Sequence, residues 1–250
     1  GIGAQFRRTC GLGVEADLSL RSISLSNSIL AMLFTDYYTW NIPLEIASGV
    51  YLAVPIQDIE RVTKGTNQHS IVMKDGKEWQ GKLFGKVTDL KDKTYNLSKV
   101  TSLNIIELPE EEDSLKEERP LSDSWVLKIA ARDDLTFRVV DPFFAFNYYS
   151  SLGYITGGAT HEAQTNFCYL TVNGEEHIIN IDDFVRLSIQ PDELTKEYNH
   201  LSVETKSGVK TAGTLVLREE DEEGEHESQG EWFLTARAAD DEKIVIALNG

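Results

Sequence analysis

A nine-residue apolar pattern occurs three times in this chain and constrains its fold more than any other feature. The copies cover residues 54–62, 95–103 and 179–187, and in each the first, third, sixth and ninth residues are apolar. A step of two places apolar residues on one face of a strand, whereas a step of three needs a turn of 3-10 helix. Each copy therefore predicts a strand, a 3-10 turn and a second strand. Residues 246–250 resemble the start of a fourth copy.

A glycine-rich hairpin also occurs twice, in residues 74–83 and 206–215. The two segments share a lysine, two glycines and a leucine at the same spacing: Lys74, Gly76, Gly81 and Leu83, and Lys206, Gly208, Gly213 and Leu215. Asp75-Gly76 is suited to a two-residue hairpin turn. The order double tyrosine, nine-residue pattern and glycine hairpin runs twice through the chain, which predicts a tandem duplication.

Residues 72–85 resemble the first signature of Sm-like proteins: Val72, Asp75-Gly76 and then Gly81, Leu83 and Gly85 in alternate positions. The strand, 3-10 turn and strand that follow are similar to the close of SH3-like small barrels. The resemblance implies an all-β fold of tandem duplicated small SH3-like or Sm-like barrels in two similar halves.

Sm-like proteins bind RNA, and the resemblance implies RNA binding through the lysine-rich segment 74–99 as one alternative. The Arg-Gly pair of the second Sm-like signature is absent from residues 97–103. We therefore expect no nucleic acid among the partners.

The domain organisation that we predict follows the repeats. It comprises an N-terminal arm at 1–16, a first half at 17–108 with modules at about 17–64 and 66–108, an acidic linker at 109–123, and a second half at 124–250 with modules at about 124–190 and 199–250. The joint is recognised in residues 107–120, which hold seven acidic residues and two prolines. Charge and proline together favour a solvated connector.

The net charge of −17 comes mainly from this joint and from residues 219–227, which hold seven further acids. Such a balance favours solubility and opposes nucleic-acid binding, because phosphate neutralisation needs clustered lysine and arginine. No apolar run approaches the roughly 20 residues of a membrane helix. A periplasmic or secreted location is weakly favoured.

Two cysteines, Cys10 and Cys168, could form one disulfide in an oxidising compartment, but a buried free thiol at Cys168 is the favoured interpretation. His161, Cys168 and His177 could meet across a hairpin as zinc ligands. No pair stands at the tight spacing of a recognisable zinc site, so we expect no metal and no cofactor.

Motifs of serine hydrolases, zinc proteases and phosphate-binding loops are absent. Asp182-Asp183 is the best carboxylate pair, but it falls at the bend of a repeated pattern, where turn and cap residues are expected. A hydrolase with a site between the halves, using Asp182, Asp183 and His161, remains the alternative to a protein without catalysis.

Two double tyrosines at matching places provide the candidate binding residues. They are Tyr37 and Tyr38, with Trp40 nearby, and Tyr148 and Tyr149. In strands, one tyrosine of each pair points outward, where it can contribute contact area at low entropic cost. The other interpretation is that both rings are covered by a neighbouring module. The leading hypothesis is a non-catalytic binding or assembly module of a bacterial envelope or secreted protein, with a protein or glycan partner.

Overall fold

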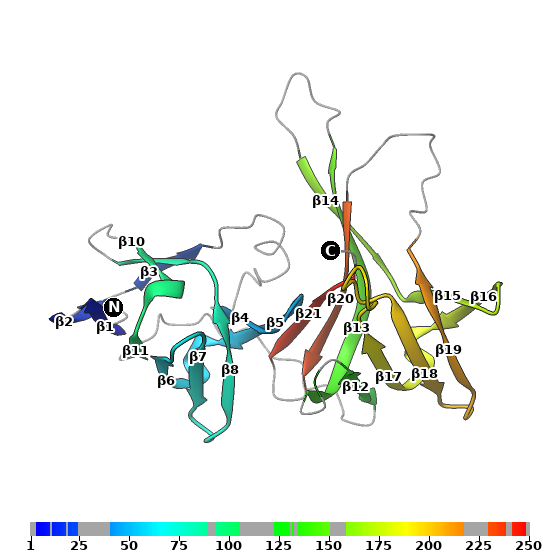
Figure 1. Cartoon of the computed structure of the whole chain (residues 1–250), viewed down its shortest axis with the longest axis horizontal. Coiled ribbons are helices and arrows are strands. Elements are labelled where there is room, and N and C mark those ends of the chain that lie inside the picture. The colour runs from blue at the N-terminus through cyan, green and yellow to red at the C-terminus, as the bar shows by residue number, and fades with distance from the viewer. Residues whose placement is uncertain are drawn as a thin grey trace. The chain divides into compact units, whose positions relative to one another are not determined.

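The computed structural model is all-β, as the repeats predicted, and its helical segments are short 3-10 turns (Figure 1). The structure describes residues 4–10, 12–18, 20–24, 41–89, 94–105, 123–130, 132, 135–150, 159–217, 230–238 and 242–248. Only the backbone is described for residues 4–24, 87–95, 102–105, 146–150, 159–163 and 230 within those ranges. In the described part, no helix has the length and apolar content needed to span a bilayer.

The chain divides into two compact units, unit 1 (Gly1–Glu117) and unit 2 (Glu118–Gly250). The division falls between residues 117 and 118, inside the segment 109–123 that the sequence predicts to be an acidic linker. Residues 106–122 themselves lie outside the described residues. Each unit is described below by itself.

Unit 1 is built on a framework of five antiparallel strands. These are β4 (Asn41–Ala47), β5 (Val50–Pro55), β6 (Ile59–Lys64), β7 (His69–Met73) and β8 (Glu78–Leu83). Ladders join them in the order β5-β4-β8-β7-β6. The 3-10 helix η1 (Ile56–Asp58) connects the two outer strands, β5 and β6, so these strands meet at that turn.

Unit 2 contains the same framework. Its strands are β15 (Phe167–Val172), β16 (Glu175–Asn180), β17 (Phe184–Gln190), β18 (His200–Thr205) and β19 (Lys210–Val216). The order is β16-β15-β19-β18-β17, and η4 (Ile181–Asp183) joins β16 to β17. We call these two sets of strands the unit 1 framework and the unit 2 framework.

The residue registers of the two frameworks coincide. His69 pairs with Gly81 in unit 1, and Leu201 pairs with Gly213 in unit 2. The backbone N–H of Lys74 donates to Asp58 O at 2.8 Å, and that of Lys206 donates to Asp183 O at 2.8 Å. The recurrence therefore extends from strand order to single backbone hydrogen bonds.

The nine-residue pattern forms a strand, a 3-10 turn and a strand at all three places, as predicted. The third place consists of β10 (Thr94–Asn96), η2 (Leu97–Lys99) and β11 (Ser102–Ile105). The apolar residue that opens each 3-10 helix is 0% or 1% exposed: Ile56, Leu97 and Ile181. Burial of such a side chain stabilises a fold by roughly 2 kcal/mol, which explains why the spacing is repeated. At the predicted fourth place, β21 (Lys243–Ala247) is a strand, and residues 249–250 lie outside the described part.

The hairpin at Asp75-Gly76 differs from the two-residue turn that the sequence predicted. Met73 N–H donates to Lys77 O at 2.8 Å, so the loop has three residues, and only Gly76 within it has a positive φ, of 88°. This is a turn followed by a glycine bulge, a common three-residue hairpin. At the second framework's β15–β16 hairpin, Asn173 and Gly174 both have positive φ, of 51° and 84°, as a two-residue turn requires.

A glycine at the centre of each framework allows two strands to approach closely. A Cβ added to Gly81 on β8 would lie 2.3 Å from the Glu45 carbonyl oxygen on β4. A Cβ added to Gly213 on β19 would lie 2.5 Å from the Thr171 carbonyl oxygen on β15. Both distances are shorter than any real contact, so only glycine fits at these two equivalent positions.

The remaining described strands of unit 1 are β1 (Ala4–Cys10), β2 (Leu12–Leu18), β3 (Leu20–Ser24) and β9 (Lys86–Asp89). β1 pairs with β2 and with β11, whereas the sequence predicted an arm at 1–16. Apolar residues alternate along β2 at positions 12, 14, 16 and 18, the spacing of one face of a strand. Strand β11 also pairs with β6, and β3 pairs with β9. The ladders β6–β7 and β4–β8 join strands on both sides of residue 65, where the sequence predicted a division between two modules.

The remaining described strands of unit 2 are β12 (Trp125–Ile129), β13 (Thr136–Ser150), β14 (Ala159–Thr165), β20 (Gly230–Ala238) and β21. β13 pairs with β12, β14 and β20, and β20 pairs with β21. β12 runs parallel to β17 and connects these strands to the framework. The Trp125 ring packs edge-on against Phe184, with 5.7 Å between centroids, in the core of this unit.

Candidate functional site

A pocket of about 530 Å³ opens at one end of the unit 1 framework. It is formed by the end of β6, the β6–β7 connection, the end of β8, the start of β9 and the region of η2. Its lining residues are Lys64, Thr66, Asn67, Gln68, His69, Lys82, Leu83, Phe84, Gly85, Lys86, Asn96 and Ser98. We call it the basic pocket, because three lysines and no carboxylate are among these residues.

The three lysines come from three different strands. Lys64 ends β6, Lys82 lies on β8 and Lys86 begins β9, and all three side chains are exposed. Within the described part of the chain, no carboxylate forms an ion pair with any of these ammonium groups. Glu45 pairs with Lys82 in the β4–β8 ladder, and its Oε1 accepts a hydrogen bond from Gly49 N–H at 3.2 Å. The pocket is therefore locally positive in a chain of net charge −17.

His69 forms the buried wall of the pocket and is only 4% exposed. Its Nε2 lies 2.9 Å from Val100 O, and since a carbonyl only accepts, Nε2 carries the proton. Burial lowers the pKa of His69 below 6.5, the hydrogen bond to Val100 raises it, and the nearby charge of Lys64 lowers it further. The net direction is downward, so the ring is neutral at physiological pH and fastens β7 to the segment after η2.

The η2 side of the pocket is held by a side-chain cap. Asn96 Oδ1 accepts from the backbone N–H of Ser98 at 3.0 Å and from its hydroxyl at 2.7 Å. Leu97 N–H donates to Gly85 O at 3.0 Å, which ties η2 to the junction between β8 and β9. On the opposite side, Gln68 Nε2 donates to Gln80 Oε1 at 2.6 Å. The lining is thus fixed by hydrogen bonds, while the lysine side chains remain available to a ligand.

The corresponding place in the unit 2 framework is built differently. Ile189 pairs with Leu201 there, where Lys64 pairs with His69 in unit 1, and Ile189 and Leu201 are 0% and 2% exposed. The connection between the two strands covers residues 191–199 in unit 2, but only 65–68 in unit 1. The longer connection carries three carboxylates, Asp192, Glu193 and Glu197, and one lysine, Lys196, whereas the shorter one carries only hydroxyl and amide side chains.

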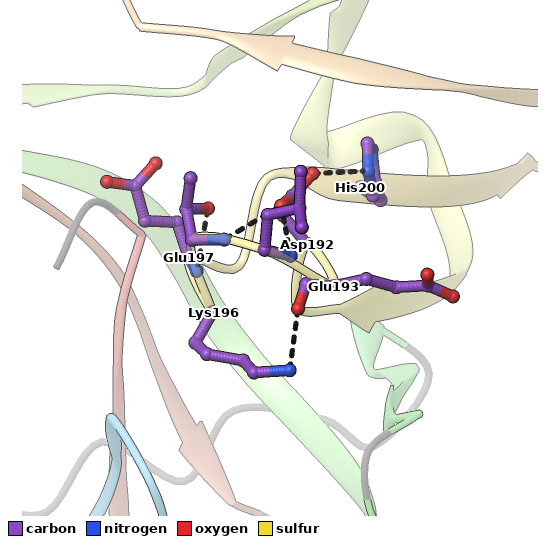
Figure 2. A network of polar contacts seen from close by, with 7 residues as sticks. Asp192, Glu193, Lys196, Glu197 and His200 are labelled. Atoms are coloured by element: carbon purple, nitrogen blue, oxygen red, sulfur yellow. Dashed lines mark hydrogen bonds and ion pairs between the residues drawn. The ribbon is translucent and has the colours of Figure 1, made fainter.

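Figure 2 shows how the unit 2 connection is held by its own polar groups. Asp192 Oδ1 accepts from the backbone N–H groups of Leu194 and Thr195 at 2.8 and 2.9 Å. Asp192 Oδ2 lies 3.4 Å from His200 Nε2. The two backbone hydrogen bonds, mainly, lower the pKa of Asp192. Lys196 Nζ donates to Glu193 O at 2.7 Å.

The last residue of the same connection is hydrogen-bonded to β19. Leu215 N–H donates to Asn199 O at 2.7 Å, and the neighbouring Tyr198 is 3% exposed. Tyr198 stands three residues before Leu201, and Thr66 of the basic pocket stands three residues before His69. Counted back from the strand that follows, a buried aromatic ring in unit 2 therefore stands where an exposed threonine lines the pocket in unit 1.

The predicted tyrosine site stays a prediction. Tyr37, Tyr38 and Trp40 lie outside the described residues. Tyr148 and Tyr149 lie in β13, where only their backbone is described. Tyr148 pairs with His161 on β14 and with Gly230 on β20, and Tyr149 pairs with Thr160.

The carboxylate pair of the alternative hydrolase hypothesis lies in η4, with both side chains exposed. Asn180 Oδ1 caps this turn by accepting from Asp182 N–H at 2.9 Å, and Asp183 O accepts the hydrogen bond from Lys206 described above. These contacts are those of turn residues, as the repeat predicted. The side chain of His161 lies outside the described part.

Cys168 is a free thiol that is 1% exposed, as the favoured interpretation predicted. Burial raises the pKa of this thiol to about 12, which keeps it protonated. His177, opposite Leu170 on β16, is exposed. The described residues contain no group of three histidine, cysteine or acidic side chains placed to hold a metal ion.

Sequence reasoning identified the lysine-rich segment but not the pocket. The surplus of lysine between residues 74 and 99 was the available signal, and Lys82 and Lys86 belong to it. Lys64 and His69 come from an earlier segment, so only the β6–β7 and β7–β8 ladders bring them to the same place. Comparison with protein-family models, with curated proteins and with solved structures found no match to this chain.

Proposed function

We propose that this chain is a non-catalytic binding module of a bacterial envelope or secreted protein, made of two tandem duplicated small barrels of SH3-like or Sm-like type. The barrel proposal is supported by two frameworks with the same strand order and register. In each, a 3-10 helix of three residues joins the two outer strands, as expected for a small barrel closed at that turn.

The observation that carries the binding function is the difference between the frameworks at one equivalent end. Unit 1 has an open pocket of about 530 Å³ there, lined by polar and basic side chains. Unit 2 has the buried residues Tyr198 and Leu201 there. Its volume lies in the range of small-ligand sites, and its polar lining suits a ligand that is bound through charge and hydrogen bonds. The strand registers of the two frameworks are the same, and only unit 1 has this open pocket among the described residues. We therefore place ligand binding in unit 1.

A role without catalysis is supported by what the polar residues near the turns do. Asp182 and Asp183 serve the η4 turn, and His69 has its ring nitrogen engaged by Val100 O. Lysine, amide and hydroxyl groups dominate the pocket lining, and these recognise polar ligands by hydrogen bonds and charge. The double tyrosines would form a second contact surface for a protein or glycan partner.

The experiment that tests the binding function is a thermal-shift screen of the full chain against small anions, sugars and sugar phosphates. The variant Thr66→Trp fills the mouth of the basic pocket without removing a charge, and Val209→Trp adds the same ring to an exposed position of unit 2. We expect a ligand that raises the melting temperature of the wild type and of Val209→Trp but not of Thr66→Trp. Mass spectrometry of the recovered ligand should show it unchanged.

Two outcomes would contradict the proposal. Chemical conversion of the ligand by the wild type, lost in a pocket variant, would make the protein an enzyme. Stabilisation that persists in Thr66→Trp for every ligand would remove the pocket from the function.

A further inference from the structure

We propose that the basic pocket of unit 1 takes a compact ligand that carries a phosphate ester or diphosphate group. This inference rests on the proposed function and names the chemical class of its ligand. It depends on three observations from the described residues: three lysines without a carboxylate partner converge on one pocket, no carboxylate lines it, and the positions of Lys64 and Lys82 hold uncharged residues in unit 2.

The charge of the pocket selects for an anion. Lys64, Lys82 and Lys86 bring three positive charges from three strands to one opening. Like charges at one opening repel one another, and a bound anion removes that repulsion. Glu45 is the carboxylate opposite Lys82, and it cannot neutralise all three ammonium groups. A ligand with two or three negative charges matches the surplus.

The neutral groups of the pocket suit phosphate oxygens. Thr66 and Asn67 lie in the β6–β7 connection and carry hydroxyl and amide donors beside Lys64. On the η2 side the Ser98 hydroxyl donates to Asn96 Oδ1, and the NH2 group of the same Asn96 amide supplies donors to the pocket. Phosphate presents several strong acceptor oxygens to donors arriving from different directions, and charge-assisted hydrogen bonds to it are about twice as strong as neutral ones.

The size and surroundings of the pocket favour a compact ligand over a long polyanion. A volume of about 530 Å³ accommodates a sugar phosphate or a diphosphate, but not a chain of nucleotides. Nucleic-acid affinity comes from many phosphate contacts, and this acidic chain offers three lysines at the site and no arginine between residues 66 and 108. RNA is therefore the disfavoured occupant, and the experiment includes it as a competing outcome.

The unit 2 framework provides an internal comparison for the charge argument. Thr214 stands where Lys82 stands in unit 1, because Thr171 pairs with Thr214 as Glu45 pairs with Lys82. Ile189 likewise stands at the place of Lys64. The same strand pairing forms in unit 2 without these two charges, so Lys64 and Lys82 are not required by the fold. Arg218 has the spacing that corresponds to Lys86, and it lies outside the described residues.

The experiment is calorimetric titration of the full chain with inorganic pyrophosphate, with a hexose phosphate and with a short single-stranded RNA. The test variants are Lys64→Gln, Lys82→Gln and the triple variant Lys64→Gln/Lys82→Gln/Lys86→Gln. The matched control is Lys74→Gln, an exposed lysine at the other end of the β7–β8 hairpin. Circular dichroism of each variant verifies that it is folded.

We expect pyrophosphate and the hexose phosphate to bind the wild type. Each single pocket variant should weaken binding about fivefold, and the triple variant about 50-fold or more. Lys74→Gln should change it by less than about twofold, and raising NaCl from about 50 to about 200 mM should weaken it about tenfold. Binding of pyrophosphate alone, with no binding of the hexose phosphate, would identify a free anion as the ligand source, and the reverse would identify an organic phosphate.

Three results would overturn the inference. They are no heat from either phosphate compound, binding that survives the triple variant, or tighter binding of RNA than of both compounds. None of these removes the binding function by itself, because a neutral ligand that is lost in Thr66→Trp but kept in the triple variant would leave the module a binder of another chemical class.

Discussion

The two frameworks of this protein have the same strand order and register, but at one end the side chains are basic and polar in unit 1 and apolar in unit 2. In unit 1, Lys64, His69 and Gly81 stand in one row across β6, β7 and β8. In unit 2 the same row holds Ile189, Leu201 and Gly213. Only the glycine is common to both rows. The glycine is needed by the fold, because it lets two neighbouring strands approach closely. The other two positions of the row can differ without changing the strand pairing.

The connections between the corresponding strands, β6–β7 in unit 1 and β17–β18 in unit 2, also differ in chemistry. Residues 65–68 leave a basic pocket open in unit 1, whereas residues 191–199 form a self-capped acidic loop in unit 2 (Figure 2). Loops carry function when a rigid scaffold positions them.

Cys168 should react only when unit 2 unfolds locally and exposes the buried thiol on β15. Cys168 pairs with Ile179 on β15–β16, where Ile42 pairs with Val54 in unit 1, so it packs as an apolar residue in a shared position. With the pKa of its thiol at about 12, we expect it to react with a disulfide reagent at least about 1,000-fold more slowly than free cysteine. The measurement is the modification rate in a Cys10→Ser background, in native buffer and in urea. Reaction at the free-cysteine rate in the native state would show that β15 is not buried as described.

Alanine at either central glycine should disrupt its own unit. Gly81→Ala and Gly213→Ala each force a Cβ against a backbone carbonyl, so we expect losses of about 3 kcal/mol in the free energy of unfolding. Urea unfolding monitored by hydrogen exchange would assign each loss to a unit. Costs that differ greatly between the two variants would break the equivalence of the frameworks.

Alanine at the hairpin glycines should cost less. Gly76 and Gly208 have φ of 88° and 83°, with open space where a Cβ would lie. Left-handed backbone strain is then the only penalty, so we expect each of Gly76→Ala and Gly208→Ala to lower stability by about 1 kcal/mol. The same urea titrations measure it, and a cost as large as that of Gly81→Ala would mean that the turn, not the strand crossing, limits the fold.

The pH dependence of unit 1 should contain a small contribution from His69 that unit 2 lacks. The pKa of folded His69 is below 6.5, so its contribution to stability is present above that value and is lost as the pH falls through the folded pKa. His69→Leu, which copies Leu201, should flatten the fall in stability of unit 1 between about pH 7.5 and about pH 5. An unaltered slope in His69→Leu would refute the assignment.

The repeats in the sequence predicted the local structure well because burial dictates them. The spacing of Val54, Ile56, Ile59 and Val62 has one solution, a strand bent by a 3-10 turn, and all four side chains are at most 1% exposed. The hairpin at Gly76 was located correctly but given one residue too few, because Asp-Gly fits both a two-residue turn and a glycine bulge. The strands within residues 1–16 were not foreseen, because the glycines of this segment suggested an irregular arm, although Leu12, Val14 and Ala16 alternate as in a strand.

The site was harder to predict because it depends on pairing between distant residues. Lys64 and Lys82 are separated along the chain, and a pattern in one segment does not show that β6 and β8 both border β7. The double tyrosines were predicted as binding residues because they occur in both halves of the sequence. The pocket instead lies at positions where the two frameworks differ. Where two frameworks share strand order and register, we therefore expect a binding site at the positions at which they differ.

Hydrogen–deuterium exchange of the full chain, with and without pyrophosphate, tests the central claim most directly. The account predicts slower exchange in residues 64–69, 82–86 and 96–98 of unit 1, and no change in residues 189–201 and 213–217 of unit 2. Protection of the unit 2 residues, or equal protection of both sets, would contradict the claim that one copy of a shared framework has become the anion site.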